Sequence, residues 1–166
     1  MTKAEKYSSI LRGNPAASCV GDSRVAAMRE KETAFGIGRL ETYTGFAEQV
    51  HQTKRALLDF LIGAKHAKKT IVGYGAPAKG NTLLNYCGVR TDFLDYVVDR
   101  SPHKQGLFLP GTHIPVYSPD RIRQTRPDYI LILPWNIKDE IIEQMSYVRE
   151  WGAKFAIPIP RVEVIA

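Results

Sequence analysis

The 166-residue sequence has few cysteines and no long hydrophobic run, and each shortage excludes a class of protein. Cys19 and Cys87 are too few and too far apart for a disulfide framework or a metal-binding knuckle. No stretch reaches the roughly 18 consecutive apolar residues that a membrane-spanning helix needs. The charged N-terminus has no apolar signal core behind it. We therefore expect a cytoplasmic chain with no bound metal and no membrane partner.

The common self-contained catalytic motifs are also missing. The sequence has no Gly-x-Ser-x-Gly elbow, no His-Glu-x-x-His pair and no cysteine nucleophile beside a histidine. No closely spaced pair of carboxylates suggests acid–base hydrolysis. We therefore predict no catalytic residue in this chain.

A net charge of +6 permits anionic partners, but the basic residues are scattered. The densest cluster, at residues 65–69, is typical of a solvated helix end whose cations are favoured by the helix dipole. No stripe of alternating aromatic and basic residues is present to stack bases. The charge pattern therefore favours a small anionic ligand, and we expect no nucleic-acid partner.

What the sequence does contain is an alternation of strand and helix patterns. Short apolar runs predict strands at residues 70–73, 93–99, 129–133 and 153–157. Helices are expected between them, at residues 78–87, from residue 118 to just before Pro127, and at 137–152. Residues 100–115 are expected to form a loop, with 114–116 a candidate for a further short extended piece. This alternation predicts a Rossmann-like three-layer α/β domain with a mostly parallel sheet in the order 2-1-3-4.

The region before the first strand predicts a different organisation. Residues 1–38 show little hydrophobic periodicity, apart from a short helix expected at 23–35, and are interpreted as a linker or N-terminal extension. Residues 40–65 carry apolar side chains at helical spacing and predict a long amphipathic helix of about seven turns. We expect its apolar face to pack on the sheet. The α/β domain is accordingly assigned to residues 39–166.

The first strand runs into a glycine-containing turn and then a helix. Gly73 and Gly75 occupy the first and third positions of the dinucleotide fingerprint, and Ala78 is an accepted variant at the sixth. Pro77 removes one backbone donor from the loop. Lys79 is not followed by Ser or Thr, so the Walker pattern is absent. The turn suits an anion at a helix N-terminus, but it equally suits a bare strand-to-helix turn that needs small residues for packing.

Three loops, at residues 74–79, 99–106 and 134–137, are expected to meet at the carboxyl edge of the sheet. Asp99 is placed either to hydrogen-bond a ribose or to cap its own loop. The polar and aromatic loop residues are candidates for phosphate, sugar or base contacts, with solvated or lid-forming side chains as the alternative. The predicted substrate- and nucleotide-binding set is Gly73, Tyr74, Gly75, Ala76, Lys79, Asp99, His103, Lys104, Trp135 and Asn136.

Four segments of the chain, in this order, resemble the C-terminal domain of the sugar C-methyltransferases. They are residues 71–80, 97–106, 110–116 and 132–136. The resemblance extends from about Glu41 to the end of the chain. Residues 25–32 also resemble the linker that leads into that domain.

The resemblance implies a role within a larger enzyme. That family joins a zinc-binding N-terminal domain, an S-adenosylmethionine-binding domain and a Rossmann-like C-terminal domain, and it methylates a carbon of a deoxyketosugar carried on a nucleoside diphosphate. This sequence lacks the zinc-binding cysteines, the central domain and the His-Gly-Gly-Ser stretch before the linker. It is therefore expected to bind no cofactor itself, S-adenosylmethionine belonging to the missing domain. Its implied role is to help hold the nucleotide sugar for a methyltransferase domain in cis or in trans.

Two other functions remain open from the residues alone. Asp99 and the paired glycines would also suit a stand-alone NAD(P)-binding oxidoreductase-like domain. The long helix at residues 40–65 would also suit a non-catalytic assembly scaffold. A fold alone does not decide among these functions.

Overall fold

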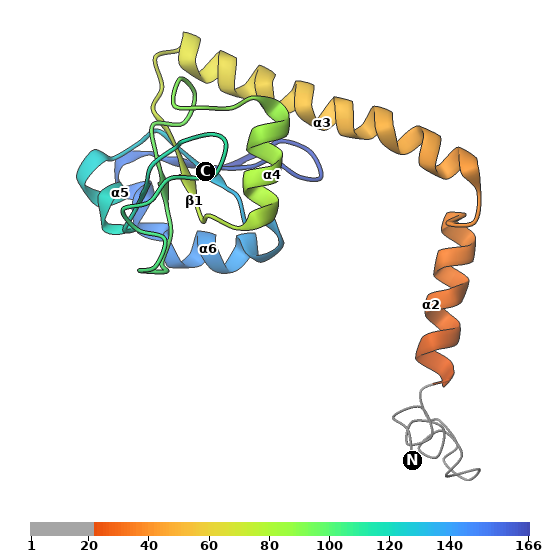
Figure 1. The fold of residues 1–166 in the computed structure, drawn as a ribbon. Helices are drawn as coiled ribbons and strands as arrows, with labels where there is room; N and C mark the ends of the chain where they lie inside the picture. Colours follow the sequence, from red (N-terminus) through yellow and green to blue (C-terminus); the bar gives the residue numbers. More distant parts are fainter. Residues whose placement is uncertain (1–21) are drawn as a thin grey trace, which may run out of the picture. The chain divides into compact units, whose positions relative to one another are not determined.

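The computed structural model describes residues 22–166 (Figure 1). Its α-helices are α2 (Asp22–Phe35), α3 (Leu40–His66), α4 (Ala78–Cys87), α5 (Asp120–Thr125) and α6 (Lys138–Gln144). Two short 3-10 helices, η1 (Trp135–Ile137) and η2 (Ser146–Trp151), flank α6. The strands are β1 (Ile71–Tyr74), β2 (Val97–Val98), β3 (Val116–Tyr117), β4 (Tyr129–Ile132), β5 (Lys154–Ile157) and β6 (Glu163–Ile165).

The chain divides into two compact units, Met1–Phe46 and Ala47–Ala166, and each is described by itself. The predicted extension at residues 1–38 lies partly outside the described residues. Within the first unit, α2 occupies the position of the helix predicted at 23–35. A turn follows it, in which the Gly36 N–H donates to the Thr33 carbonyl at 3.0 Å, before α3 begins.

The second unit is built on one six-stranded sheet, in the order β3-β2-β1-β4-β5-β6. Neighbouring strands are parallel except β5 and β6, which pair antiparallel. The inner strands β2-β1-β4-β5 follow the predicted order, and the edge strands β3 and β6 extend it on both sides. The fold is therefore the expected α/β, Rossmann-like one, with a longer strand order than predicted.

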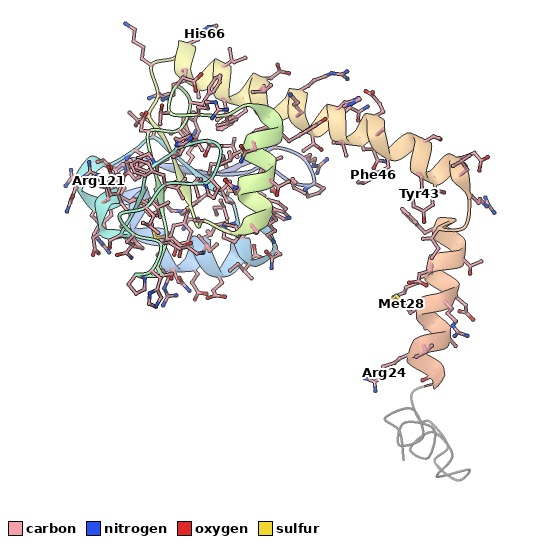
Figure 2. All side chains as sticks on the ribbon, viewed as in Figure 1. Arg24, Met28, Tyr43, Phe46, His66 and Arg121 are labelled. Atoms are coloured by element: carbon pink, nitrogen blue, oxygen red, sulfur yellow. The ribbon has the colours of Figure 1, made fainter. Side chains whose placement is uncertain are left out.

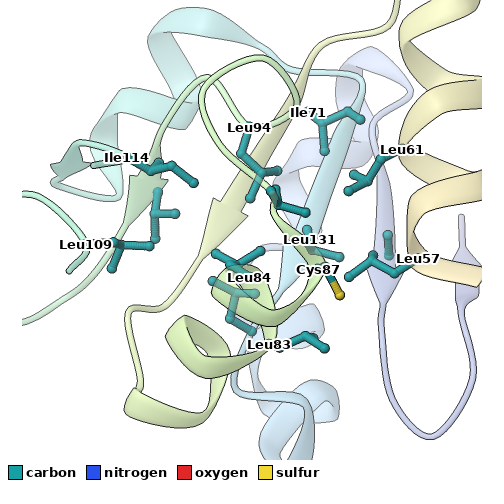
Figure 3. Close-up of a cluster of buried hydrophobic side chains, with 14 of the residues drawn as sticks. Leu57, Leu61, Ile71, Leu83, Leu84, Cys87, Leu94, Leu109, Ile114 and Leu131 are labelled. Atoms are coloured by element: carbon teal, nitrogen blue, oxygen red, sulfur yellow. The ribbon is translucent and has the colours of Figure 1, made fainter. Parts of the chain in front are cut away.

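Both faces of the sheet are covered because its strands are apolar on both sides. One buried cluster joins α3 and α4 to the sheet, as Figure 3 shows for Leu57, Leu61 and Leu84 facing Ile71 and Leu131. The opposite cluster joins the sheet to α5, α6 and η2. Its largest members are Val72, Tyr74, Tyr96, Val98, Ile122, Ile130, Ile132, Ile141, Met145, Val148, Phe155 and Ile157. The sheet and the helices on its two faces therefore form three layers.

Within the second unit, α3 packs on the sheet through its C-terminal part. Within Ala47–Ala166, its buried residues are Leu57, Leu61 and Ala64. The Phe60 ring also meets Tyr129 edge-on, with centroids 5.2 Å apart and an angle of 87° between the rings. The predicted packing of this helix on the sheet is therefore present, and within Ala47–Ala166 its C-terminal part provides it.

Two predicted elements have different bounds in the structure. The strand predicted at residues 93–99 is reduced to β2, because the N–H groups of Phe93 and Leu94 both donate to the Arg90 carbonyl at 3.0 Å and form a turn. The helix predicted at 137–152 ends at Gln144 and continues as the tighter η2. The apolar residues 145, 148 and 151 are three positions apart, and a 3-10 helix has three residues per turn. Their side chains therefore lie on the same side of this segment.

Candidate functional site

The loops that follow β1 and β2 are joined at the carboxyl edge of the sheet. The Asp99 carboxylate accepts hydrogen bonds from the Ala76 N–H at 2.7 Å and the Ser101 N–H at 2.8 Å. The Lys104 ammonium donates to the Ala76 carbonyl at 3.0 Å and lies 3.1 Å from Asp99 Oδ2. The Gln105 side-chain amide donates to the Asp99 carbonyl at 2.9 Å. Asp99 thus ties the loops after β1 and β2 together.

The charge state of Asp99 follows from these contacts. Burial by itself would raise the pKa of this carboxyl, since only 13% of its side chain is exposed. The N–H donors of Ser101 and Ala76 and the Lys104 ammonium outweigh burial and hold the pKa below its usual value. Both carboxylate oxygens are engaged within the protein, so the geometry matches the loop-capping alternative more closely than a free ribose acceptor.

The glycines of the β1–α4 turn are explained by close packing. A side chain at Gly73 would come within 2.7 Å of Val97 Cγ2, and one at Gly75 within 2.5 Å of Pro134 Cγ. The ring of Pro134 therefore fills the space directly beside Gly75. The need for small residues in close packing therefore accounts for both glycines. The turn does not leave its backbone open to a ligand along its whole length.

A helix N-terminus follows this turn, at the start of α4. Its first N–H groups have no intrahelical acceptor, and Pro77 provides no side-chain cap for them. The Lys79 ammonium lies 4.6 Å from the centre of the Trp135 ring and donates to the side-chain oxygen of Asn136. Three predicted site residues, Lys79, Trp135 and Asn136, are therefore in contact.

The structure does not gather all of the predicted residues. His103 is exposed in the turn after β2, and within residues 22–166 it makes no side-chain hydrogen bond or ion pair. Tyr74 and Gly75 are buried and lie on the side of Pro134 that faces α6. The predicted set is therefore divided between the start of α4 and a separate cavity at α6.

That cavity has a volume of about 150 Å³ and opens between β1, the end of β2 and α6. Tyr74, Gly75 and Asp99 line it, together with Arg100, Glu140 and Gln144, which the sequence reasoning missed. The Gln144 amide donates to Glu140 at 2.8 Å, and Arg100 donates to the Gln144 side-chain oxygen at 3.4 Å. The signal for the Glu140–Gln144 pair was present in the sequence, because positions i and i+4 of a helix share a face.

Within the described residues, nothing resembles a nucleophile or a metal centre. Cys87 is buried against α3, and burial raises the pKa of its thiol, which keeps it protonated. No group of three or more His, Cys, Asp or Glu side chains in residues 22–166 is placed to hold a metal ion. No helix among these residues is long and apolar enough to cross a membrane. The site offers hydrogen-bond donors, a cation and aromatic surface, which are the means of binding a ligand.

Comparison with known proteins identifies the family to which the chain is similar. Residues 12–160 match the family described as the C-methyltransferase C-terminal domain. The C-methyltransferase NovU of Streptomyces niveus is 37% identical over 142 residues, which cover 86% of this chain and 34% of that protein. The chain thus spans about a third of the length of this curated relative.

A solved structure is also similar to part of the chain. It is the UDP-D-quinovosamine 4-dehydrogenase from Vibrio fischeri, with 18% identity and a TM-score of 0.42, and the match covers 59% of this chain and 93% of that one. A similarity this low bears on neither substrate nor activity. The match over residues 12–160 and the identity to NovU are sufficient: the chain belongs to the family of C-methyltransferase C-terminal domains.

Proposed function

We propose that this chain is the substrate-side domain of an S-adenosylmethionine-dependent C-methyltransferase, and that it helps to hold a nucleotide-linked deoxysugar. Methyl transfer and S-adenosylmethionine then belong to a catalytic domain supplied in cis or in trans. The proposal rests on the family and on the ligand-binding character of the carboxyl edge of the sheet, where the described residues offer no nucleophile.

The observation that carries the binding role is the environment of Lys79. Its ammonium is held by the neutral Trp135 ring and the neutral Asn136 amide. No carboxylate among residues 22–166 forms an ion pair with it. The cation stands beside the uncapped start of α4, where backbone N–H groups favour an anion. A diphosphate supplies the missing negative charge.

Calorimetric titration with thymidine diphosphate glucose tests this proposal. Lys79→Met is expected to weaken binding about tenfold, because it removes a charge-assisted contact and leaves the apolar part of the side chain. Lys54→Met is the matched control, since the Lys54 ammonium also lies over an aromatic ring, 5.0 Å from the centre of Tyr86. Equal affinity of Lys79→Met and the wild type would exclude a phosphate contact at this lysine.

Amide hydrogen exchange provides a second test of the same contact. The Ala76 N–H is already bonded to Asp99, so its protection does not report on a ligand. The N–H groups of Ala78, Lys79 and Gly80, in the first turn of α4, are the informative ones. Thymidine diphosphate glucose is expected to slow their exchange, and S-adenosylmethionine is expected to leave it unchanged.

A place for the catalytic domain is suggested by the first unit. Leu40, Tyr43 and Phe46 are spaced three residues apart at the start of α3 and are 73%, 58% and 61% exposed. Figure 2 shows the Tyr43 and Phe46 side chains on this part of the helix. Side chains three or four positions apart form one helix face, and an apolar face this exposed is typical of a partner contact. The relative NovU is about three times as long as the matched region, so a further domain of that enzyme is the proposed partner.

This partner is tested by supplying the rest of NovU as a separate chain and following the complex by sedimentation. Phe46→Ser is expected to weaken association about tenfold or more, since it removes a large apolar contact. Ile62→Ser, at an exposed residue of the second unit, serves as the control. An unchanged complex with Phe46→Ser would assign the contact to another surface.

The oxidoreductase alternative is not favoured by the position of Asp99. Asp99 Oδ2 already accepts hydrogen bonds from the Ala76 N–H and Lys104, and Oδ1 accepts one from the Ser101 N–H, so most of its acceptor capacity is used within the protein and little remains for a ribose. A flat titration of NADH fluorescence with wild-type protein is therefore the expected result.

A further inference from the structure

The cavity at α6 contains a polar group that the fold leaves unused. Tyr74 is only 6% exposed, yet its hydroxyl has no hydrogen-bond partner among the described residues. The hydroxyl is not among the fully enclosed polar atoms of the described residues, so it reaches the cavity and can donate a hydrogen bond there. The ring packs among Val72, Ile141 and Met145, so only the hydroxyl end is available to the cavity.

Charged groups surround this phenol. Burial raises the pKa of the Tyr74 phenol, the Arg100 cation lowers it, and the acids Asp99 and Glu140 raise it further. Arg100, Asp99 and Glu140 all line the cavity. The phenol remains protonated and is therefore available as a hydrogen-bond donor.

The chemistry of the walls indicates a neutral, hydroxyl-bearing ligand. Tyr74 and Arg100 donate, Glu140 accepts, and Gln144 does both. Glu140 brings a negative charge that offsets the Arg100 cation in the same space, so the lining favours a neutral ligand over a phosphate. Pro134 and Ile137 supply apolar surface. At about 150 Å³ the cavity is smaller than the 300–1,000 Å³ of typical ligand pockets, so one ring fits it and a whole nucleotide does not.

We propose that the cavity formed by Tyr74, Arg100, Glu140 and Gln144 is a subsite for a sugar ring, which it recognises through the ring's hydroxyl groups. This subsite rests on the proposed function, since the ring belongs to the same nucleotide sugar whose diphosphate meets Lys79. Pro134 lines the cavity and packs against Gly75, and the next two residues, Trp135 and Asn136, contact Lys79, so the loop after β4 contributes to both positions.

Three substitutions in the full chain test the subsite by titration with thymidine diphosphate glucose. Tyr74→Phe is expected to weaken binding about five- to tenfold, because one hydrogen bond is lost. Its unfolding midpoint is expected to stay at the wild-type value, since the hydroxyl has no protein partner to lose. Tyr86→Phe, at an exposed tyrosine, is the matched control and is expected to bind as the wild type does.

Glu140→Gln distinguishes a sugar from a phosphate by the sign of its effect. For a hydroxyl ligand the variant is expected to weaken binding about tenfold, because an ionised acceptor is replaced by a neutral one. For a phosphate in the cavity the same variant would strengthen binding, since a like charge is removed, and that result overturns the subsite.

The remaining outcomes separate the two proposals. If the wild type binds and neither Tyr74→Phe nor Glu140→Gln changes the affinity, the subsite is wrong while the proposed function stands. If the wild type binds no thymidine diphosphate glucose, both proposals fall. Titration with thymidine diphosphate, which lacks the hexose, shows which sugar ring occupies the cavity. If it is the pentose, Tyr74→Phe weakens the binding of thymidine diphosphate as much as that of thymidine diphosphate glucose. If it is the hexose, Tyr74→Phe leaves the affinity for thymidine diphosphate unchanged.

Discussion

At the scale of single residues, Asp99 joins two loops through hydrogen bonds from the Ala76 and Ser101 N–H groups and an ion pair with Lys104. Asp99→Asn retains one acceptor but turns an amide N–H₂ toward a backbone N–H donor, so we expect a loss of about 1–3 kcal/mol in the free energy of unfolding. Asp95→Asn is the control, because Asp95 is 43% exposed and its pairing with Lys65 at 3.2 Å is a surface contact. Urea denaturation at neutral pH measures both.

The same carboxylate predicts a pH dependence with a definite sign. The pKa of Asp99 in the folded protein lies below the ordinary value of 3.8, so the unfolded chain binds its proton more readily. The stabilisation by Asp99 is therefore complete above that value and is lost as the pH falls through the folded pKa. Denaturation of wild type and Asp99→Asn over an acid series is expected to show their stabilities converging below pH 3.8. A constant difference down to that acid range would exclude the charge as its source.

Alanine substitutions at two glycines with similar φ angles distinguish the cost of backbone strain from the cost of steric crowding. Gly75 has φ +82° with Pro134 against it, whereas Gly88 has φ +76° with nothing within 4 Å of its missing side chain. Gly88→Ala is expected to cost about 1–2 kcal/mol through backbone strain alone. Gly75→Ala should cost about 1–3 kcal/mol more because the added methyl group overpacks Pro134. Unfolding curves for the two variants measure the difference, and equal losses would show that the Pro134 loop moves aside.

At the scale of elements, α3 has one buried and one exposed side where it packs on the sheet. Leu61 is completely buried in the cluster shown in Figure 3, while the adjacent Ile62 is 41% exposed. Leu61→Ala is therefore expected to lose about 2–5 kcal/mol of stability, and Ile62→Ala less than about 1 kcal/mol. Thermal or urea unfolding provides the measurement. Similar losses from both variants would mean that the helix is rotated on the sheet.

At the scale of the whole molecule, the two buried clusters define what is needed to fold. Every core residue in both clusters lies at or after Leu57. Deletion of residues 1–46 removes no residue of these cores. The free energy of unfolding of the shortened chain is therefore expected to lie within about 1 kcal/mol of that of the full chain. Urea unfolding of the two chains tests this. A clearly less stable short chain would show that the first unit contributes to the core of the second.

The sequence by itself determined the elements whose patterns are local. The apolar runs gave β1, β4 and β5, and the amphipathic spacing gave α3, because alternation and helical periodicity depend only on neighbouring residues. The inner strand order followed from the handedness of strand–helix–strand connections. The glycine turn and the convergence of three loops on one edge followed from the same topology.

Only the tertiary structure decided how those loops are used. Pro134 fills the space beside Gly75, and Asp99 binds the Ala76 N–H, through contacts between residues far apart in the chain that no local pattern records. The edge strand β6 exists because β5 offers it a pairing edge, and Glu140 joins Tyr74 in one cavity because α6 packs over β1. Packing and long-range hydrogen bonds, which depend on the whole fold, therefore placed the candidate ligand sites on the two sides of Pro134.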